Sequence, residues 1–189
     1  MLYTTLNKLK AVEGWDEDFG KLTKALYDRG NCREGSRDDL PVRLTDILEI
    51  CGVDAAVVWG VTSCGEEAID FARRFALLCA RHVEDLIDSP TVKKCNEMCD
   101  RFLDGSATRR ELMDACFGLD TFGDARIDDF VNSASGLVEM ALLSVTTEKI
   151  LGAAALAVRD CYYAAQMVEK GPEELEWIGE TFRKMLEKD

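Results

Sequence analysis

Apolar residues recur every three or four positions along nearly the whole chain, and this spacing restricts the fold more than any other feature. It is clearest in residues 66–87, where it involves Ile69, Ala72, Phe75, Ala76, Cys79, Val83 and Leu86, widened by Phe71, Leu78 and His82. Such spacing puts apolar side chains on one face of an α-helix. No segment shows the period of two that is typical of a strand. The sequence therefore predicts an all-α fold, a bundle of about seven to nine helices with a small-residue-rich central helix.

Glycine and proline divide the first part of this pattern. A helix is expected over residues 16–29, ending at Gly30, and the polar residues 31–39 are expected to form a loop or linker. Pro41 is expected in the first turn of a short helix that ends at Gly52. The next short helix is expected to bury Val57, Val58 and Trp59.

Capping signals divide the second part. Ser89 and Pro90 are expected as the N-cap and first residue of one helix, and residues 108–111 (TRRE) form a capping box for the next. Residues 147–170 are rich in small residues, mostly alanine, so this helix is expected at the centre of the bundle, where small side chains let neighbours approach closely. A last amphipathic helix is expected over residues 173–187.

The 189 residues suit one domain or two small ones. We expect residues 1–40 to form an N-terminal helical segment and loop, and residues 41–189 to form the helical bundle, in one continuous domain. The N-terminus lacks the pattern of a secretory signal, and the longest apolar stretches are shorter than the roughly 18–20 residues that cross a bilayer. The chain is therefore expected to be cytoplasmic, without a membrane partner.

The net charge of −13 and the pI near 4.6 exclude a broad basic face for duplex DNA, which lysine and arginine would have to supply. Between residues 114 and 148 the net charge is −6, from seven acids (Asp114, Asp120, Asp124, Asp128, Asp129, Glu139 and Glu148) against one base, Arg126. A basic patch lies just upstream: Lys93, Lys94, Arg101, Arg109 and Arg110. The acidic region is either ordinary solvated surface or a face for a basic partner, such as a nucleic-acid-binding groove.

Eight cysteines are scattered along the chain, and no two have the Cys-x-x-Cys spacing of a zinc or redox motif. Free cysteine is among the most buried residue types. We therefore expect the cysteines to pack in the core, with no metal, disulfide or cofactor.

No phosphate-binding glycine loop is present, and His82 is the one histidine of the chain. His82 is expected to pack at a helix edge. A thiolate–imidazole pair with Cys79, one turn earlier, is the alternative. Carboxylate pairs such as Glu173–Glu174 are interpreted as solvated or first-turn acids. An enzyme is therefore not expected, and the alternative is an enzyme or ligand-binding module with a pocket beside Trp59, Cys79 and His82.

Two stretches, residues 75–90 (FALLCARHVEDLIDSP) and 100–112 (DRFLDGSATRREL), resemble a group of helical proteins from bacteria and phages. Members pair a C-A-R-x-V-x-x-L-x-x-D-P helix end with an E-R-x-x-x-G-x-A-T-x-x-E-L helix–turn–helix and an Ala-rich C-terminal helix. Residues 50–59 (ICGVDAAVVW) look like the N-G-L-D-D-A-L-W turn of the group, and residues 150–165 correspond to its Ala-rich tail. The tail here contains more leucine, valine, tyrosine and methionine, and the chain has more cysteine.

Some members of that group are labelled immunity proteins of toxin systems, and many are encoded in phage genomes. The resemblance implies an inhibitor from a mobile element and assigns no catalytic residue. Our hypothesis is a non-enzymatic inhibitor that blocks a larger protein, in counter-defence of the anti-CRISPR type against a Cas nuclease, through an acidic face that mimics nucleic acid. A toxin-neutralising immunity protein is the alternative that differs in its target.

Overall fold

The computed structural model describes residues 2–12, 16–29, 41–119 and 126–188. The all-α fold class is confirmed, because the described residues include eight helices of seven residues or more. The chain forms two compact units, Met1–Ala68 with Gly179–Asp189 and Ile69–Ile178. Residue 40, where the N-terminal segment was expected to end, lies within the first unit. The division into residues 1–40 and 41–189 stays a prediction.

The first unit contains a short antiparallel ribbon of strands β1 (Tyr3–Thr5) and β2 (Pro41–Arg43), with Thr4 opposite Val42. Neither strand was expected, because three residues are too few for a period of two to stand out. The expectation that Pro41 begins a helix is wrong. Proline is tolerated at the first position of a strand, and the helix begins three residues later.

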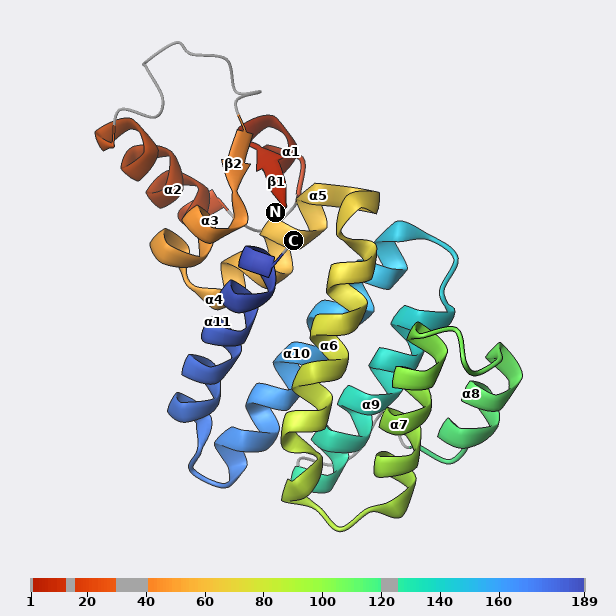
Figure 1. The fold of residues 1–189 in the computed structure, drawn as a ribbon. Helices are drawn as coiled ribbons and strands as arrows, with labels where there is room; N and C mark the ends of the chain where they lie inside the picture. Colours follow the sequence, from red (N-terminus) through yellow and green to blue (C-terminus); the bar gives the residue numbers. More distant parts are fainter. Residues whose placement is uncertain (1, 13–15, 30–40, 120–125, 189) are drawn as a thin grey trace. The chain divides into compact units, whose positions relative to one another are not determined.

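Short helices complete this unit (Figure 1): α1 (Leu6–Lys10), α2 (Asp16–Asp28), α3 (Leu44–Cys51), α4 (Val53–Ala55), a π-helical turn (Ala56–Val61), α5 (Thr62–Cys64) and a 3₁₀ turn (Gly65–Ala68). Gly52 ends α3 as expected, with a φ of 92° that favours glycine. Val57 is buried, but Trp59 is half-buried and Val58 is 38% exposed, so the expected burial of all three is wrong.

The second unit is a bundle of long helices: α6 (Ile69–Val83), α7 (Pro90–Leu103), α8 (Arg109–Cys116), α9 (Ile127–Leu143) and α10 (Thr147–Met167), with a 3₁₀ turn (Glu84–Leu86) after α6. Figure 1 shows α6, α9 and α10 side by side, and α10 packs on both of the others. Its buried alanines are Ala153, Ala154, Ala157, Ala164 and Ala165. The prediction of a central helix rich in small residues is confirmed within this unit.

The predicted caps are also present. Ser89 accepts a hydrogen bond from the Val92 amide with Pro90 at the first helical position, and Thr108 and Glu111 form the capping box of α8. The core of α6 includes Phe75, which is 2% exposed. Leu78, by contrast, is 42% exposed, so its expected place in the apolar stripe is wrong.

Helix α11 (Gly171–Lys188) contributes its first residues to the second unit and its residues from Gly179 onward to the first. The chain turns at Val168–Lys170, where Glu169 has a φ of 63°. Gly171 and Pro172 thus form the start of α11. No helix in the part of the chain that the structure describes has the length and apolar character needed to cross a membrane.

Candidate ligand pocket

A pocket of about 400 Å³ opens in the second unit where the end of α6 meets the start of α11. It is lined by His82, Val83, Asp85, Leu86, Ala165, Lys170, Glu173, Glu174 and Trp177. His82 comes from the last turn of α6, and Glu174 and Trp177 lie three residues apart on α11, so they share one face of that helix. The pocket therefore depends on the turn after α10, which brings α11 back to α6.

His82 makes two contacts with α11. Its ring stacks on the indole of Trp177, with the centroids 3.7 Å apart and the planes at 4°. Its Nε2 atom lies 3.1 Å from Oε2 of Glu174. The expectation that His82 packs its ring at a helix edge and bonds a neighbour is confirmed, and the side chain remains 39% exposed.

Burial controls the protonation of this pair. The Glu174 side chain is 6% exposed, and desolvation raises the pKa of its carboxyl to about 7. Burial, and then the positive charge of Lys170, lower the pKa of His82. Both shifts favour a neutral carboxyl beside a neutral imidazole over an ion pair.

The second carboxyl oxygen of Glu174, Oε1, is buried and has no hydrogen-bond partner among the described residues. Burying a polar atom without a hydrogen-bond partner costs free energy, so a ligand that donates a hydrogen bond to this oxygen gains binding free energy. Glu173 and Glu174 both lie in the first turn of α11 as interpreted, and Glu173 is exposed, but Glu174 is buried and not solvated. The sequence contained one usable signal, the spacing of Glu174 and Trp177 beside the buried Ile178.

The predicted alternative of a reactive Cys79 lacks support. Cys79 is fully buried, and desolvation followed by the charge of Glu174 raises its thiol pKa well above the ordinary value, so the nucleophilic thiolate is disfavoured. Trp59, the third residue of the expected pocket, belongs to the other unit and does not line this one. The site thus offers a proton donor–acceptor pair and an aromatic wall.

The structure divides the predicted acidic region. Asp114 on α8 is exposed and lies 3.8 Å from Arg110. Asp128 and Asp129, in the first turn of α9, both pair with Arg126. Asp120 and Asp124 lie outside the described residues. Glu139 is half-buried, and desolvation raises its pKa, whereas Glu148 is exposed.

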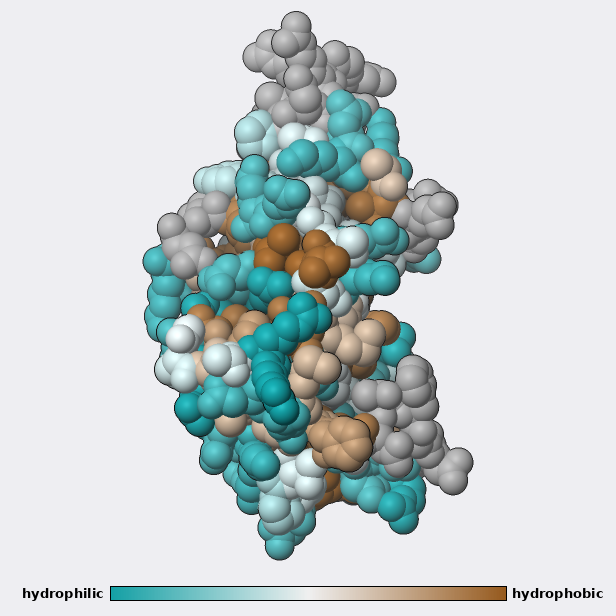
Figure 2. Space-filling view, turned by 90° about the vertical axis from the view of Figure 1, so that its right-hand side faces the viewer, coloured by the Kyte–Doolittle hydropathy of each residue, from teal (hydrophilic) through white to brown (hydrophobic). Residues whose placement is uncertain are grey.

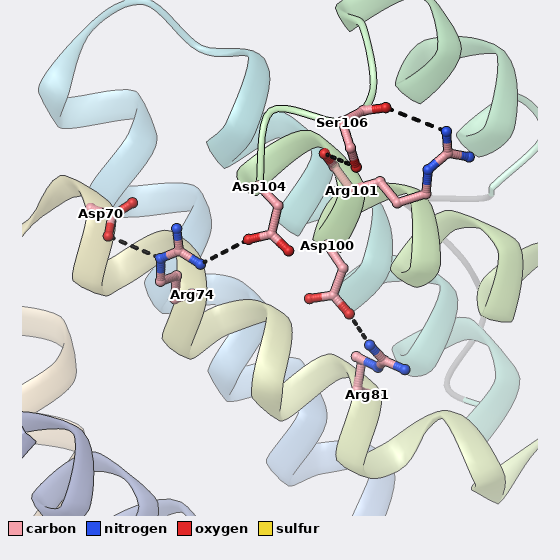
Figure 3. Close-up of polar contacts among 7 residues, drawn as sticks. All are labelled: Asp70, Arg74, Arg81, Asp100, Arg101, Asp104 and Ser106. Atoms are coloured by element: carbon pink, nitrogen blue, oxygen red, sulfur yellow. Dashed lines mark hydrogen bonds and ion pairs between the residues drawn. The ribbon is translucent and has the colours of Figure 1, made fainter.

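The predicted basic patch is also interrupted by local partners. Lys93 pairs with Asp85 at 3.7 Å, and Arg101 donates to the carbonyl oxygen of Ser106 in the turn after α7. Lys94 and Arg109 are exposed. Figure 3 shows this turn together with the ion pairs that link α6 to α7, Arg74 with Asp104 and Arg81 with Asp100. Charges of both signs therefore alternate along this surface.

The cysteines are placed mostly as expected, with one exception. Cys64, Cys79, Cys99 and Cys161 are buried free thiols, Cys51 is a half-buried one, and Cys32 lies outside the described residues. Cys95 and Cys116 form a disulfide, so the expectation that no disulfide is present is wrong. Their separation of 21 residues hides the pairing, which arises because the α7–α8 turn brings their Cα atoms to 4.9 Å.

Comparison with known proteins gives no match: no family model fits the chain, and neither the curated proteins nor the solved structures include a significantly similar one.

Proposed function

We propose that this protein is a non-enzymatic inhibitor of phage or mobile-element origin that binds and blocks a larger protein. The observation that carries the proposal is the outward surface of α8. Leu112, Ala115 and Cys116 are buried, whereas Met113 is 50% exposed and Phe117, directly after the helix, is 88% exposed. A phenylalanine left in water contributes almost nothing to folding, and aromatic residues and methionine are enriched in protein interfaces.

The surroundings of these two side chains are suited to a protein partner. Arg110 and Asp114 flank them and are both largely exposed, which gives an apolar centre with a charged rim. The side on which α8 lies in Figure 1 faces the viewer in Figure 2, where hydrophobic areas lie exposed between hydrophilic ones. We name Met113 and Phe117 the α8 anchor.

Charge points to the chemistry of the partner. The net charge of −13 attracts a basic surface over long range, and a nucleic-acid-binding groove is such a surface. A Cas nuclease is the preferred target class, and a basic toxin is the alternative. Because Asp114, Asp128 and Asp129 each have an arginine neighbour, we assign the charge to steering and the α8 anchor to affinity.

The test uses the full chain as an inhibitor of a purified RNA-guided nuclease and, separately, of a candidate toxin. Met113→Ser with Phe117→Ser should abolish inhibition while leaving the unfolding midpoint unchanged. Val145→Ser is the matched control, because Val145 is an equally exposed apolar residue at 87% and lies outside α8. Inhibition that survives the double substitution would refute the role of the α8 anchor.

A second candidate function, small-molecule binding, is favoured by the pocket that Glu174 and Trp177 line and by the buried Oε1 atom of Glu174, which has no hydrogen-bond partner among the described residues. Asp85, Glu173 and Glu174 outnumber Lys170 among the charged lining residues, so we propose a cationic ligand that donates hydrogen bonds and lies against Trp177. Agmatine is a suitable probe. At pH 8, above the pKa of about 7 of the Glu174 carboxyl, agmatine should change the tryptophan fluorescence, and Glu174→Gln should weaken binding about tenfold, the loss of one charge-assisted hydrogen bond. An unchanged affinity in Glu174→Gln would exclude this mode.

A further inference from the structure

Three cysteine side chains converge in the core of the second unit. Cys95 and Cys99 lie one turn apart on α7, and Cys116 is the last residue of α8. Their Sγ atoms all lie within 4.8 Å of one another, and the residues are 0%, 0% and 4% exposed, respectively. The disulfide uses two of these sulfur atoms and leaves Cys99 as a free thiol beside them.

The α7–α8 hairpin holds the three thiols together. The capping box at Thr108 fixes the start of α8, and three hydrogen bonds between Arg101 and Ser106 close the turn before it. Helix α9 closes the other side, where the carbonyl oxygen of Ser135 lies 3.9 Å from the sulfur of Cys95. The backbone around the cluster is therefore held by these hydrogen bonds as well as by the disulfide.

We propose that the reduced cluster of Cys95, Cys99 and Cys116 binds one trivalent thiophilic ion of the arsenic(III) or antimony(III) class. Thiolates prefer soft ions. Three thiolates neutralise a trivalent ion, and a neutral product suits a fully buried site, where an uncompensated charge is costly.

Other soft ions fit the cluster less well. Zinc favours four ligands, and among the described residues no fourth cysteine, histidine or carboxylate atom joins the three sulfurs. Zinc with three thiolates keeps a charge of −1, and copper(I) with three thiolates keeps −2.

The chemistry balances in two steps. Two molecules of a small thiol such as glutathione reduce the Cys95–Cys116 disulfide, giving two protein thiols and one glutathione disulfide. Arsenous acid, As(OH)₃, then exchanges its three hydroxyl groups for the three sulfur atoms. Three As–O and three S–H bonds break, three As–S bonds form, and three water molecules leave without any change in oxidation state. Access requires a local opening of α8, the shortest α-helix of this unit.

The experiment uses the full chain, reduced anaerobically, with sodium arsenite as the probe and native mass spectrometry as the readout. The reduced protein should gain one arsenic atom and lose three hydrogen atoms. Cys64→Ala and Cys161→Ala, which each remove a buried free thiol outside the cluster, should bind equally. Cys99→Ala and the oxidised protein should lose this adduct. Zinc and copper(I), added in parallel, should not displace arsenic.

Alkylation mapping of the unmutated protein provides a second readout that does not depend on the folding of a variant. Arsenite should protect Cys95, Cys99 and Cys116 together from iodoacetamide in the reduced protein. An adduct that persists in Cys99→Ala, protection of other cysteines instead, or displacement by zinc or copper(I) would each overturn the proposal.

Discussion

Replacing Glu174 by glutamine should change how stability depends on pH. The carboxyl is 6% exposed, and burial raises its pKa from 4.5 to about 7. The folded protein therefore holds this proton more tightly than the unfolded chain does, so stability falls as the pH rises between about 4.5 and 7. Each pH unit corresponds to about 1.4 kcal/mol, so full ionisation of Glu174 costs about 3 kcal/mol of folding free energy.

Glutamine has nearly the same shape and no ionisation. At pH 8 the Glu174→Gln protein should be more stable than the wild type by up to about 3 kcal/mol, and near pH 4.5 the two should be almost equal. Urea unfolding followed by circular dichroism at several pH values measures this difference. Groups that do not contact Glu174 are the same in both proteins, so their contributions largely cancel in the comparison.

Glu173→Gln is the matched control, because Glu173 is the exposed neighbour on the same turn. Its stability difference from the wild type should stay near zero at every pH. If the Glu174→Gln difference does not grow with pH, or if this variant is the less stable one at pH 8, the carboxyl is not held in a desolvated site and the description of the pocket is wrong.

Four further substitutions test the fold, each by urea unfolding. Phe75→Ala should destabilise the protein by about 3–5 kcal/mol because its ring is 2% exposed, and Phe102→Ala should have a smaller effect because Phe102 is half-buried; equal losses would show that the core is misplaced. Thr108→Ala should cost about 1 kcal/mol by removing the capping box of α8, and a loss near zero would contradict that role. Phe117→Ser should leave stability unchanged, and a large loss would show that the ring is packed.

Local signals predicted much of the helical framework. The caps at Ser89 and Thr108 and the helix end at Gly52 each involve neighbours within a few residues, so their residue types suffice to predict them. The same signals failed for β2. There a three-residue strand at Pro41 forms through pairing with a segment almost forty residues earlier, and that pairing leaves no local trace.

The candidate site was less predictable than the helices. His82 was identified from the sequence as a helix-edge residue, but Glu174 and Trp177 were not, because a carboxylate at the start of a helix is usually solvated. Their roles depend on α11 packing back against α6. The turns between these two helices together determine that packing. The acidic and basic patches were predicted from counts along the chain, which do not show which charges pair across helices.

The sequence by itself determined that the chain folds into helices, where most of them begin, and which helix is built from small residues. Periodicity and capping are local, and water drives every apolar stripe toward a core whatever its partner is. The tertiary structure alone decided which apolar stripes pack together. That packing buries Glu174, brings Cys95 to Cys116 and leaves Phe117 exposed. Burial, and with it the pKa of a carboxyl or the partner of a thiol, depends on segments distant along the chain, so these features came from packing.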